Sequence, residues 1–127
     1  MPWTLIGSIV MALAVISGAF GAHALKARLP AEMLAIWETA ARYHVYHGLA
    51  FFALVLVRLE SRAPREGALN AAGWLFLAGL VLFCGSLYAL ALTEKRWLGA
   101  ITPLGGLAWI AGWLCLAGAA WAGRGQG

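Results

Sequence analysis

Charge is almost absent from four long parts of this chain. Residues 3–22, 68–92 and 102–121 contain no Lys, Arg, Asp or Glu, and residues 43–57 form a shorter run of the same kind. A helix needs about 20 consecutive apolar residues to cross the hydrocarbon core of a bilayer. We therefore expect an all-α, integral membrane four-helix bundle, with spans at about 3–22, 43–58, 68–92 and 102–121.

The composition supports this expectation and limits the number of domains. Of the 127 residues, 63% are hydrophobic and 11% are charged, whereas soluble domains carry about 25% charged residues. Four spans fill a chain of this length and leave only short connections, so residues 1–127 are predicted to form a single four-span transmembrane domain. We expect the protein in a cell membrane, specifically a bacterial plasma (inner) membrane.

The positive charge lies at the ends of the apolar stretches and in their connections. This placement fits contact with anionic membrane lipids, and no basic stripe indicates a nucleic-acid partner. Four spans put both ends of the chain on one side of the membrane. The count of Lys and Arg on the two sides is nearly equal, so it leaves the orientation open. One side carries Lys26, Arg28, Arg42, Lys95 and Arg96, and the other carries Arg58, Arg62, Arg65 and Arg124.

Residues 31–58 follow a helical pattern that begins before the second apolar run. Placed on a wheel at about 100° per residue, the histidines fall on one face with apolar side chains, while Glu38 and Arg42 fall nearly opposite. We interpret this segment as an amphipathic N-terminal extension of the second helix, beginning at the membrane interface. The pattern leaves open whether the helix is continuous or bends near Gly48.

Small residues recur at helical spacing in the first and last spans. In the first span they include Gly7, Ala14, Gly18 and Ala22, with Gly21 beside them. Such a stripe allows another helix to approach closely. It predicts tight packing within the bundle or against a second copy, and we expect a homo-oligomer. The tail at residues 123–127 is polar and rich in glycine, and we expect it to be disordered.

The densest polar segment is residues 37–48. His44 and His47 are neighbours on a helix and could share a metal ion with His23, but imidazoles bonded to groups of another helix are the favoured interpretation. Glu38 precedes Arg42 by four residues, the favourable order for an ion pair within a helix. We assign no metal and no cofactor. The candidate ligand-binding or structural polar cluster is His23, Glu38, Arg42, Tyr43, His44, Tyr46 and His47.

Four blocks of sequence resemble one known family. They are residues 18–25 (GAFGAHAL), 37–47 (WETAARYHVYH), 85–93 (GSLYALALT) and 101–106 (ITPLGG). These blocks look like those of the YgdD-like small membrane proteins, a domain-of-unknown-function family. The resemblance implies a four-helix integral membrane protein, and it brings no activity, substrate or catalytic residue with it.

Three functions remain open from the sequence. The chain has no serine elbow, clustered carboxylate pair, phosphate-cradling loop or H-E-x-x-H motif, which argues against a hydrolase or a nucleotide-using enzyme. The first function is a non-enzymatic packing or interaction module in the membrane. The second is a binder or conductor of a small molecule, lipid or ion through the polar cluster. The third is a metal- or quinone-dependent redox enzyme that uses the histidines.

Overall fold

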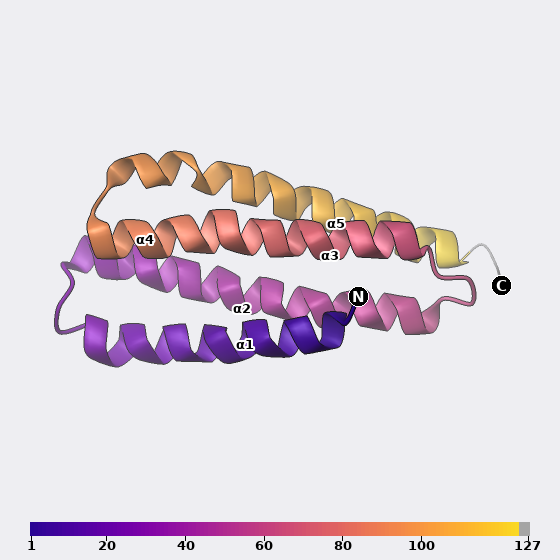
Figure 1. The fold of residues 1–127 in the computed structure, drawn as a ribbon, viewed down its shortest axis with the longest axis horizontal. Coiled ribbons are helices and arrows are strands. Elements are labelled where there is room, and N and C mark those ends of the chain that lie inside the picture. The colour runs from indigo at the N-terminus through magenta and orange to yellow at the C-terminus, as the bar shows by residue number, and fades with distance from the viewer. Residues whose placement is uncertain (125–127) are drawn as a thin grey trace.

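The computed structural model describes residues 1–124, which form four long helices joined by short connections (Figure 1). All four are long and apolar enough to cross a membrane, so the predicted all-helical fold is confirmed. The first consists of α1 (Trp3–Phe20) and η1 (Gly21–Leu25), and the second is α2 (Ala31–Glu60). The third consists of α3 (Glu66–Gly79), η2 (Leu80–Gly85) and α4 (Ser86–Thr93). The fourth consists of η3 (Arg96–Ala100) and α5 (Thr102–Arg124).

The helix bounds are wider than the predicted spans. Each predicted span lies inside one of the four helices, which run on into the charged segments at their ends. Gly123 and Arg124, expected in the tail, belong to α5, and residues 125–127 of that tail lie outside the described residues. The short helix η3 also precedes the predicted start of the last span.

The second helix is continuous. Its 30 residues form one α-helix, α2, with a length of about 45 Å. Gly48 lies within this α-helix and makes room for a neighbour: a Cβ placed there would lie 2.5 Å from Met11 Sδ. The sequence pattern left open whether this helix is continuous or bends near Gly48. In the structure, the amphipathic extension and the span form one continuous α-helix.

The helices pack in an order that leaves α1 and α5 on the outside. α1 packs mainly on α2, α5 packs mainly on α3 and η2, and α2 also contacts α3, η2 and α4 (Figure 1). The core lies along the facing sides of the two inner helices, where Phe51, Leu54, Leu69 and Phe76 are fully buried. Because lipid tails are as apolar as these side chains, this core stabilises the fold through close van der Waals packing between the helices.

Glycines face aromatic rings where the helices approach most closely. A Cβ at Gly79 would overlap the indole of Trp109, and one at Gly21 would lie 2.6 Å from Trp37 Cδ1. Gly105 lies against backbone, and a Cβ there would overlap the amide nitrogen of Phe83. Each of these glycines lets a neighbouring helix come closer than an alanine would.

The small-residue stripe of the first helix differs in part from the prediction. Gly7, Ala14 and Gly21 are buried, whereas Gly18 and Ala22 are exposed, and no other described residue lies within 4 Å of a Cβ at Gly18. A spacing of seven residues almost keeps to one face of a helix, whereas repeated steps of four drift by about 40° each. The inward row therefore follows the heptad and leaves Gly18 outside.

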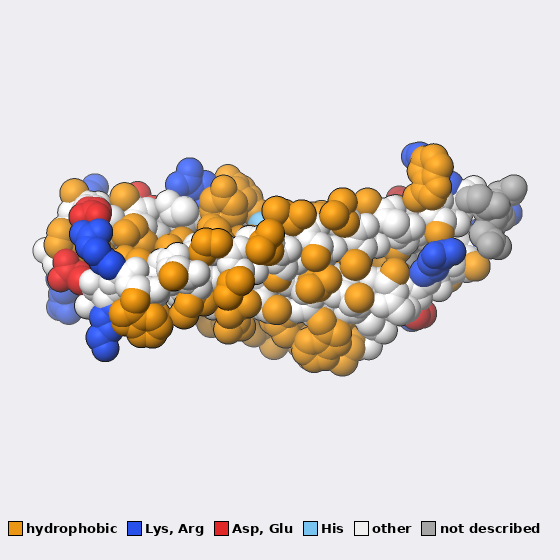
Figure 2. Space-filling view, turned by 90° about the horizontal axis from the view of Figure 1, so that it is seen from above, with side chains coloured by type: hydrophobic (Ala, Val, Ile, Leu, Met, Phe, Trp, Pro, Cys, Tyr) orange, Lys and Arg blue, Asp and Glu red, His pale blue; other side chains and the backbone are white. Residues whose placement is uncertain are grey.

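Charged side chains gather toward the two ends of the elongated molecule, with hydrophobic side chains between them (Figure 2). Exposed ion pairs join helices at both ends. Arg96 contacts both carboxylate oxygens of Glu32, at 3.1 and 3.3 Å. Arg58 Nε lies 2.7 Å from Glu66 Oε1. This distribution is that of a membrane protein with its apolar belt in lipid and its helix ends in the headgroup region.

Candidate functional site

The two histidines of α2 face the interior of the bundle. His44 and His47 are among the few buried polar residues in the part of the chain that the structure describes, the third being Ser86. Because they stand three residues apart on one helix, they share its inner face but point to different neighbours. His44 reaches α4 and His47 reaches α5, so this segment of α2 connects both halves of the bundle.

His47 has a protein partner at each ring nitrogen. The indole nitrogen of Trp113 donates to His47 Nε2 at 3.2 Å, so Nε2 acts as an acceptor and carries no proton. The proton then sits on Nδ1, which donates to the backbone carbonyl of Tyr43 at 3.0 Å. The imidazole also stacks on Trp109. This arrangement holds a neutral imidazole in one tautomer and leaves neither nitrogen available to a ligand.

His44 forms the connection to the third helix. Its Nδ1 lies 2.9 Å from the Tyr88 hydroxyl. The Tyr88 ring packs against Trp37, with centroids 4.4 Å apart, and the Trp37 indole donates to the carbonyl of Ser17 on α1 at 2.9 Å. A continuous path of side chains therefore runs from α1 through α2 to α4.

The remaining interior polar groups are paired in the same way. Cys84 donates to the Ala40 carbonyl at 3.3 Å, and Ser86 and Thr102 share a hydroxyl contact of 2.7 Å. The Trp109 indole donates to the Phe76 carbonyl at 3.1 Å. Among residues 1–124, every fully buried side-chain nitrogen or oxygen has a hydrogen-bond partner. Interior polar groups of a membrane protein need such partners because lipid supplies none.

Of the other candidate residues, Tyr43 lies at the edge of this interior network, with its ring packed against Phe83 and Trp109, and the rest lie outside it. His23 is exposed in η1, while Glu38 and Arg42 are exposed on the outward side of α2. The Tyr43 and Tyr46 side chains are 38% and 50% exposed, with their rings edge to face at 5.5 Å. Within the described residues the ion pairs are those of Glu32 and Glu66, so Glu38 and Arg42 do not pair along the helix. The structure thus divides the cluster into an inward and an outward set.

The inward histidines do not form a group of metal ligands. Among residues 1–124, no three His, Cys, Asp or Glu side chains are placed to hold one ion. His23, the third ligand considered from the sequence, is separated from the other two by its exposed position at the end of the first helix.

The aromatic partners of His47 on α5 were not identified from the sequence. Trp109 and Trp113 stand four residues apart on α5, so they present two indoles to the same neighbour. This four-residue spacing could have identified the two tryptophans as a pair on one helix face. It indicates a shared face, although it does not name the histidine that this face meets.

An elongated bundle of four membrane-length helices within residues 1–124, with its interior polar groups bonded to one another, defines a small polytopic membrane protein. Residues 17–106 match the family model described as "Protein of unknown function (DUF423)", and the chain belongs to this family. The YgdD-like resemblance is confirmed, because it refers to the same family.

Several bacterial membrane proteins are similar to the chain over nearly its whole length. It is 47% identical over 116 residues to the UPF0382 membrane protein YwdK of Bacillus subtilis. The matched region covers 91% of this chain and 93% of YwdK. It is 46% identical over 112 residues to the UPF0382 membrane protein SH2409 of Staphylococcus haemolyticus, with 88% of each chain covered. No solved structure matches the chain. The protein is therefore a membrane protein with bacterial relatives.

Proposed function

We propose that this protein is a non-enzymatic interaction module of the membrane that works as a homo-oligomer. The observation that carries the proposal is a pair of exposed charges, Glu38 and Arg42, on the outward side of a helix long enough to span the membrane. Ionisable side chains at membrane depth usually face a bundle interior, a cavity or a subunit contact. Here they face away from the interior of their own chain.

The depth of these charges follows from the packing of α1 on α2. Trp37 bonds to the Ser17 carbonyl, and Gly48 packs against Met11, so α2 runs alongside the middle of α1 between these two contacts. Glu38 and Arg42 lie between them, level with a stretch of α1 that has no charge. The charge-free run of α2, residues 43–57, is only about 22 Å long, shorter than the hydrocarbon core of about 30 Å.

A second copy of the chain offers a partner for both charges. Helical side chains point toward the N-terminus of their helix, so Arg42 reaches toward the level of Glu38, one turn away. In a parallel two-fold pair, Arg42 of each copy meets Glu38 of the other, and the same contact occurs twice. Both copies then keep the same orientation in the membrane. The half-exposed side chain of Tyr46, on the same helix, extends the contact.

The inward histidines support a packing role over the alternative functions. Both nitrogens of His47 are bonded within the chain, so a metal or quinone would have to displace Trp113 or the Tyr43 carbonyl. Binding of a small molecule or ion through the cluster would involve the outward residues Glu38, Arg42 and Tyr46. Those residues are the ones that the proposed contact between copies uses.

Charge reversal tests the contact in the intact chain. The full-length protein is reconstituted into lipid nanodiscs loaded with several chains, and its oligomeric state is counted by single-molecule photobleaching. Glu38→Arg or Arg42→Glu alone places like charges opposite each other, and we expect either to reduce the dimer fraction. The double variant Glu38→Arg with Arg42→Glu restores complementary charges and the dimer. Arg62→Glu, an exposed arginine in the connection after α2, is the matched control and leaves the dimer intact.

Two results would overturn the proposal. One is a wild-type protein that is monomeric in nanodiscs at every loading. The other is a dimer that neither single reversal weakens, which would place the contact on another surface.

A further inference from the structure

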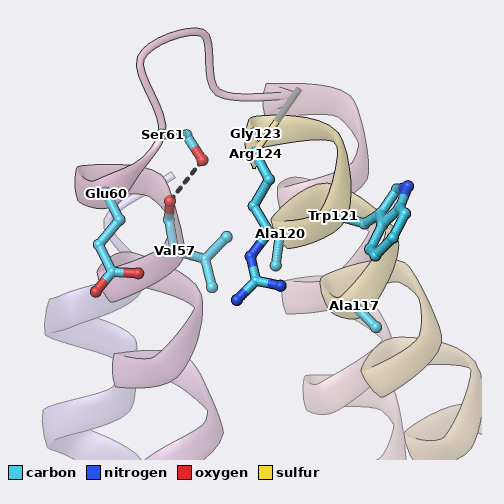
Figure 3. A pocket seen from close by; sticks show the side chains of 8 residues that line it. All are labelled: Val57, Glu60, Ser61, Ala117, Ala120, Trp121, Gly123 and Arg124. Carbon is cyan, nitrogen blue, oxygen red and sulfur yellow. Dashed lines mark hydrogen bonds between the residues drawn. The ribbon is translucent and has the colours of Figure 1, made fainter. Parts of the chain in front are cut away.

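A cleft of about 580 Å³ opens between the C-terminal ends of α2 and α5 (Figure 3). Its walls include Val57 of α2 and Ala117 and Ala120 of α5. The small alanine side chains leave the space, and the valine makes its opposite side apolar. The cleft therefore has an apolar stretch of wall on each of two neighbouring helices, beside a polar lining that includes Glu60, Ser61 and Arg124.

The outer end of the cleft is closed by a tight contact. Gly123 approaches Ser61, and a Cβ at this glycine would lie 2.6 Å from Ser61 Oγ. The Ser61 hydroxyl donates to the Val57 carbonyl at 2.8 Å. Trp121, which is 76% exposed, stands at the rim. A tryptophan in that position is typical of the boundary between lipid tails and headgroups.

Arg124 lines the cleft, and its side chain points into it (Figure 3). Arg124 turns back along α5, and its guanidinium lies between the two helices beside Ala120 (Figure 3). It forms no ion pair with any carboxylate in residues 1–124. Glu60, which also lines the cleft, points away from the guanidinium (Figure 3). A fork of donors is thus presented inside the cleft, at the level of Val57 and Ala120 (Figure 3).

The charge at this end of the molecule favours an anionic occupant. Its carboxylates include Glu60 and Glu66, and Glu66 is already paired with Arg58. Guanidinium binds phosphate with paired, charge-assisted hydrogen bonds. Anionic lipids are attracted to clusters of arginine at the membrane surface. The arginines of this end are Arg58, Arg62, Arg65 and Arg124.

We propose that this cleft is a binding site for an anionic phospholipid. Arg124 holds the phosphate at the level of Val57 and Ala120, and one acyl chain runs from there past Ala117 toward the middle of the membrane. The site is separate from the outward charges of α2, so it stands or falls independently of the proposed contact between copies.

The test compares lipids with equal acyl chains and different headgroups. Full-length protein in detergent is titrated with phosphatidylglycerol or phosphatidylcholine, and retained lipid is counted by native mass spectrometry. The wild type is expected to retain phosphatidylglycerol in preference. Arg124→Gln is expected to weaken phosphatidylglycerol binding about tenfold, the effect of losing one charge-assisted contact. Arg28→Gln removes an exposed arginine at the opposite end of the bundle, outside the cleft and its arginine cluster, and serves as the control that keeps wild-type binding.

A second variant tests the groove without touching the arginine. Ala117→Phe fills the apolar wall and is expected to lower lipid retention while the melting temperature in plain detergent stays near that of the wild type. Equal retention of the two lipids by the wild type would overturn the proposal, as would unchanged binding in Arg124→Gln. Glycerol phosphate that competes as well as the intact lipid would also overturn it, because the site would then recognise a free phosphate.

Discussion

The indole of Trp109 lies flat on the imidazole of His47, with ring centroids 3.6 Å apart and planes 4° from parallel. This contact joins α5 to α2 in the middle of the bundle, where the Trp113 indole also donates to His47. One histidine therefore fixes the position of the last helix through a stacked ring and a hydrogen bond. Its role in the structure is to hold two helices together.

Replacing His47 by alanine removes both interactions. We expect His47→Ala to lower the free energy of unfolding by about 1–3 kcal/mol, the sum of an aromatic stack and a hydrogen bond between membrane helices. The measurement is denaturant-induced unfolding in detergent micelles, followed by tryptophan fluorescence. His23→Ala is the control, because that histidine is exposed and its loss should leave the curve unchanged. Equal stability of the two variants would contradict the structural role.

The bond between His44 and Tyr88 predicts energetic coupling between α2 and α4. Tyr88→Phe removes only the hydroxyl that lies 2.9 Å from His44 Nδ1. In a double-mutant cycle with His44→Ala, we expect a coupling energy of about 0.5–1.5 kcal/mol. The four proteins of the cycle are compared by the same unfolding assay. Strictly additive effects would show that the two side chains do not stabilise each other.

The glycines that face aromatic rings predict a difference between two alanine substitutions within helices. Gly79→Ala would drive its methyl group into the indole of Trp109, so we expect a loss of stability of about 1–3 kcal/mol from overpacking. Gly18→Ala meets no described residue within 4 Å and should be neutral or slightly stabilising, because alanine favours the helix. Melting temperatures in detergent separate the two. A destabilised Gly18→Ala monomer would contradict the outward position of this residue.

The first helix is fixed to the third by a side-chain hydrogen bond near its start. The Trp3 indole donates to Asn70 Oδ1 at 3.0 Å, so Trp3→Phe is expected to lower the free energy of unfolding by about 0.5–1.5 kcal/mol. The substitution keeps a ring against Phe51, which limits the loss of packing. Trp97→Phe is the matched control, because Trp97 is 64% exposed. Limited proteolysis of the N-terminal segment provides a second measurement, with faster cleavage expected in Trp3→Phe.

Much of the fold could be predicted because lipid imposes one dominant condition. Each charge-free stretch must pair its own backbone groups, and only a helix does so within a single segment. The four helices, their order and the inward face of His44 and His47 followed from that condition and from a period of about 3.6 residues. The continuity of α2 did not follow, because a glycine such as Gly48 is compatible both with a continuous helix and with a bend.

The candidate cluster could be predicted only as a segment of sequence. Most of its residues share a short stretch of one helix, but a helix presents every direction within a single turn. Burial then divides them: His44 and His47 point inward, while Glu38 and Arg42 point outward. The partners of the histidines stand on other helices, far away in the chain, and are Tyr88, Trp109 and Trp113. Contacts of that separation depend on helix rotation, which hydropathy alone does not determine.

The third helix contains a wide, π-helical segment, η2, between α3 and α4. α3 faces α5 through Gly79, and α4 faces α2 through Tyr88, so the two halves of this helix serve different partners. A π turn holds one residue more than an α turn, and one residue corresponds to a rotation of about 100°. Deleting one residue between Leu80 and Gly85 would turn Tyr88 away from His44 while Gly79 stayed against Trp109. The η2 segment thus sets the rotation of the α4 surface that contacts α2 relative to the α3 surface that contacts α5. Both contacts therefore constrain the number of residues in η2.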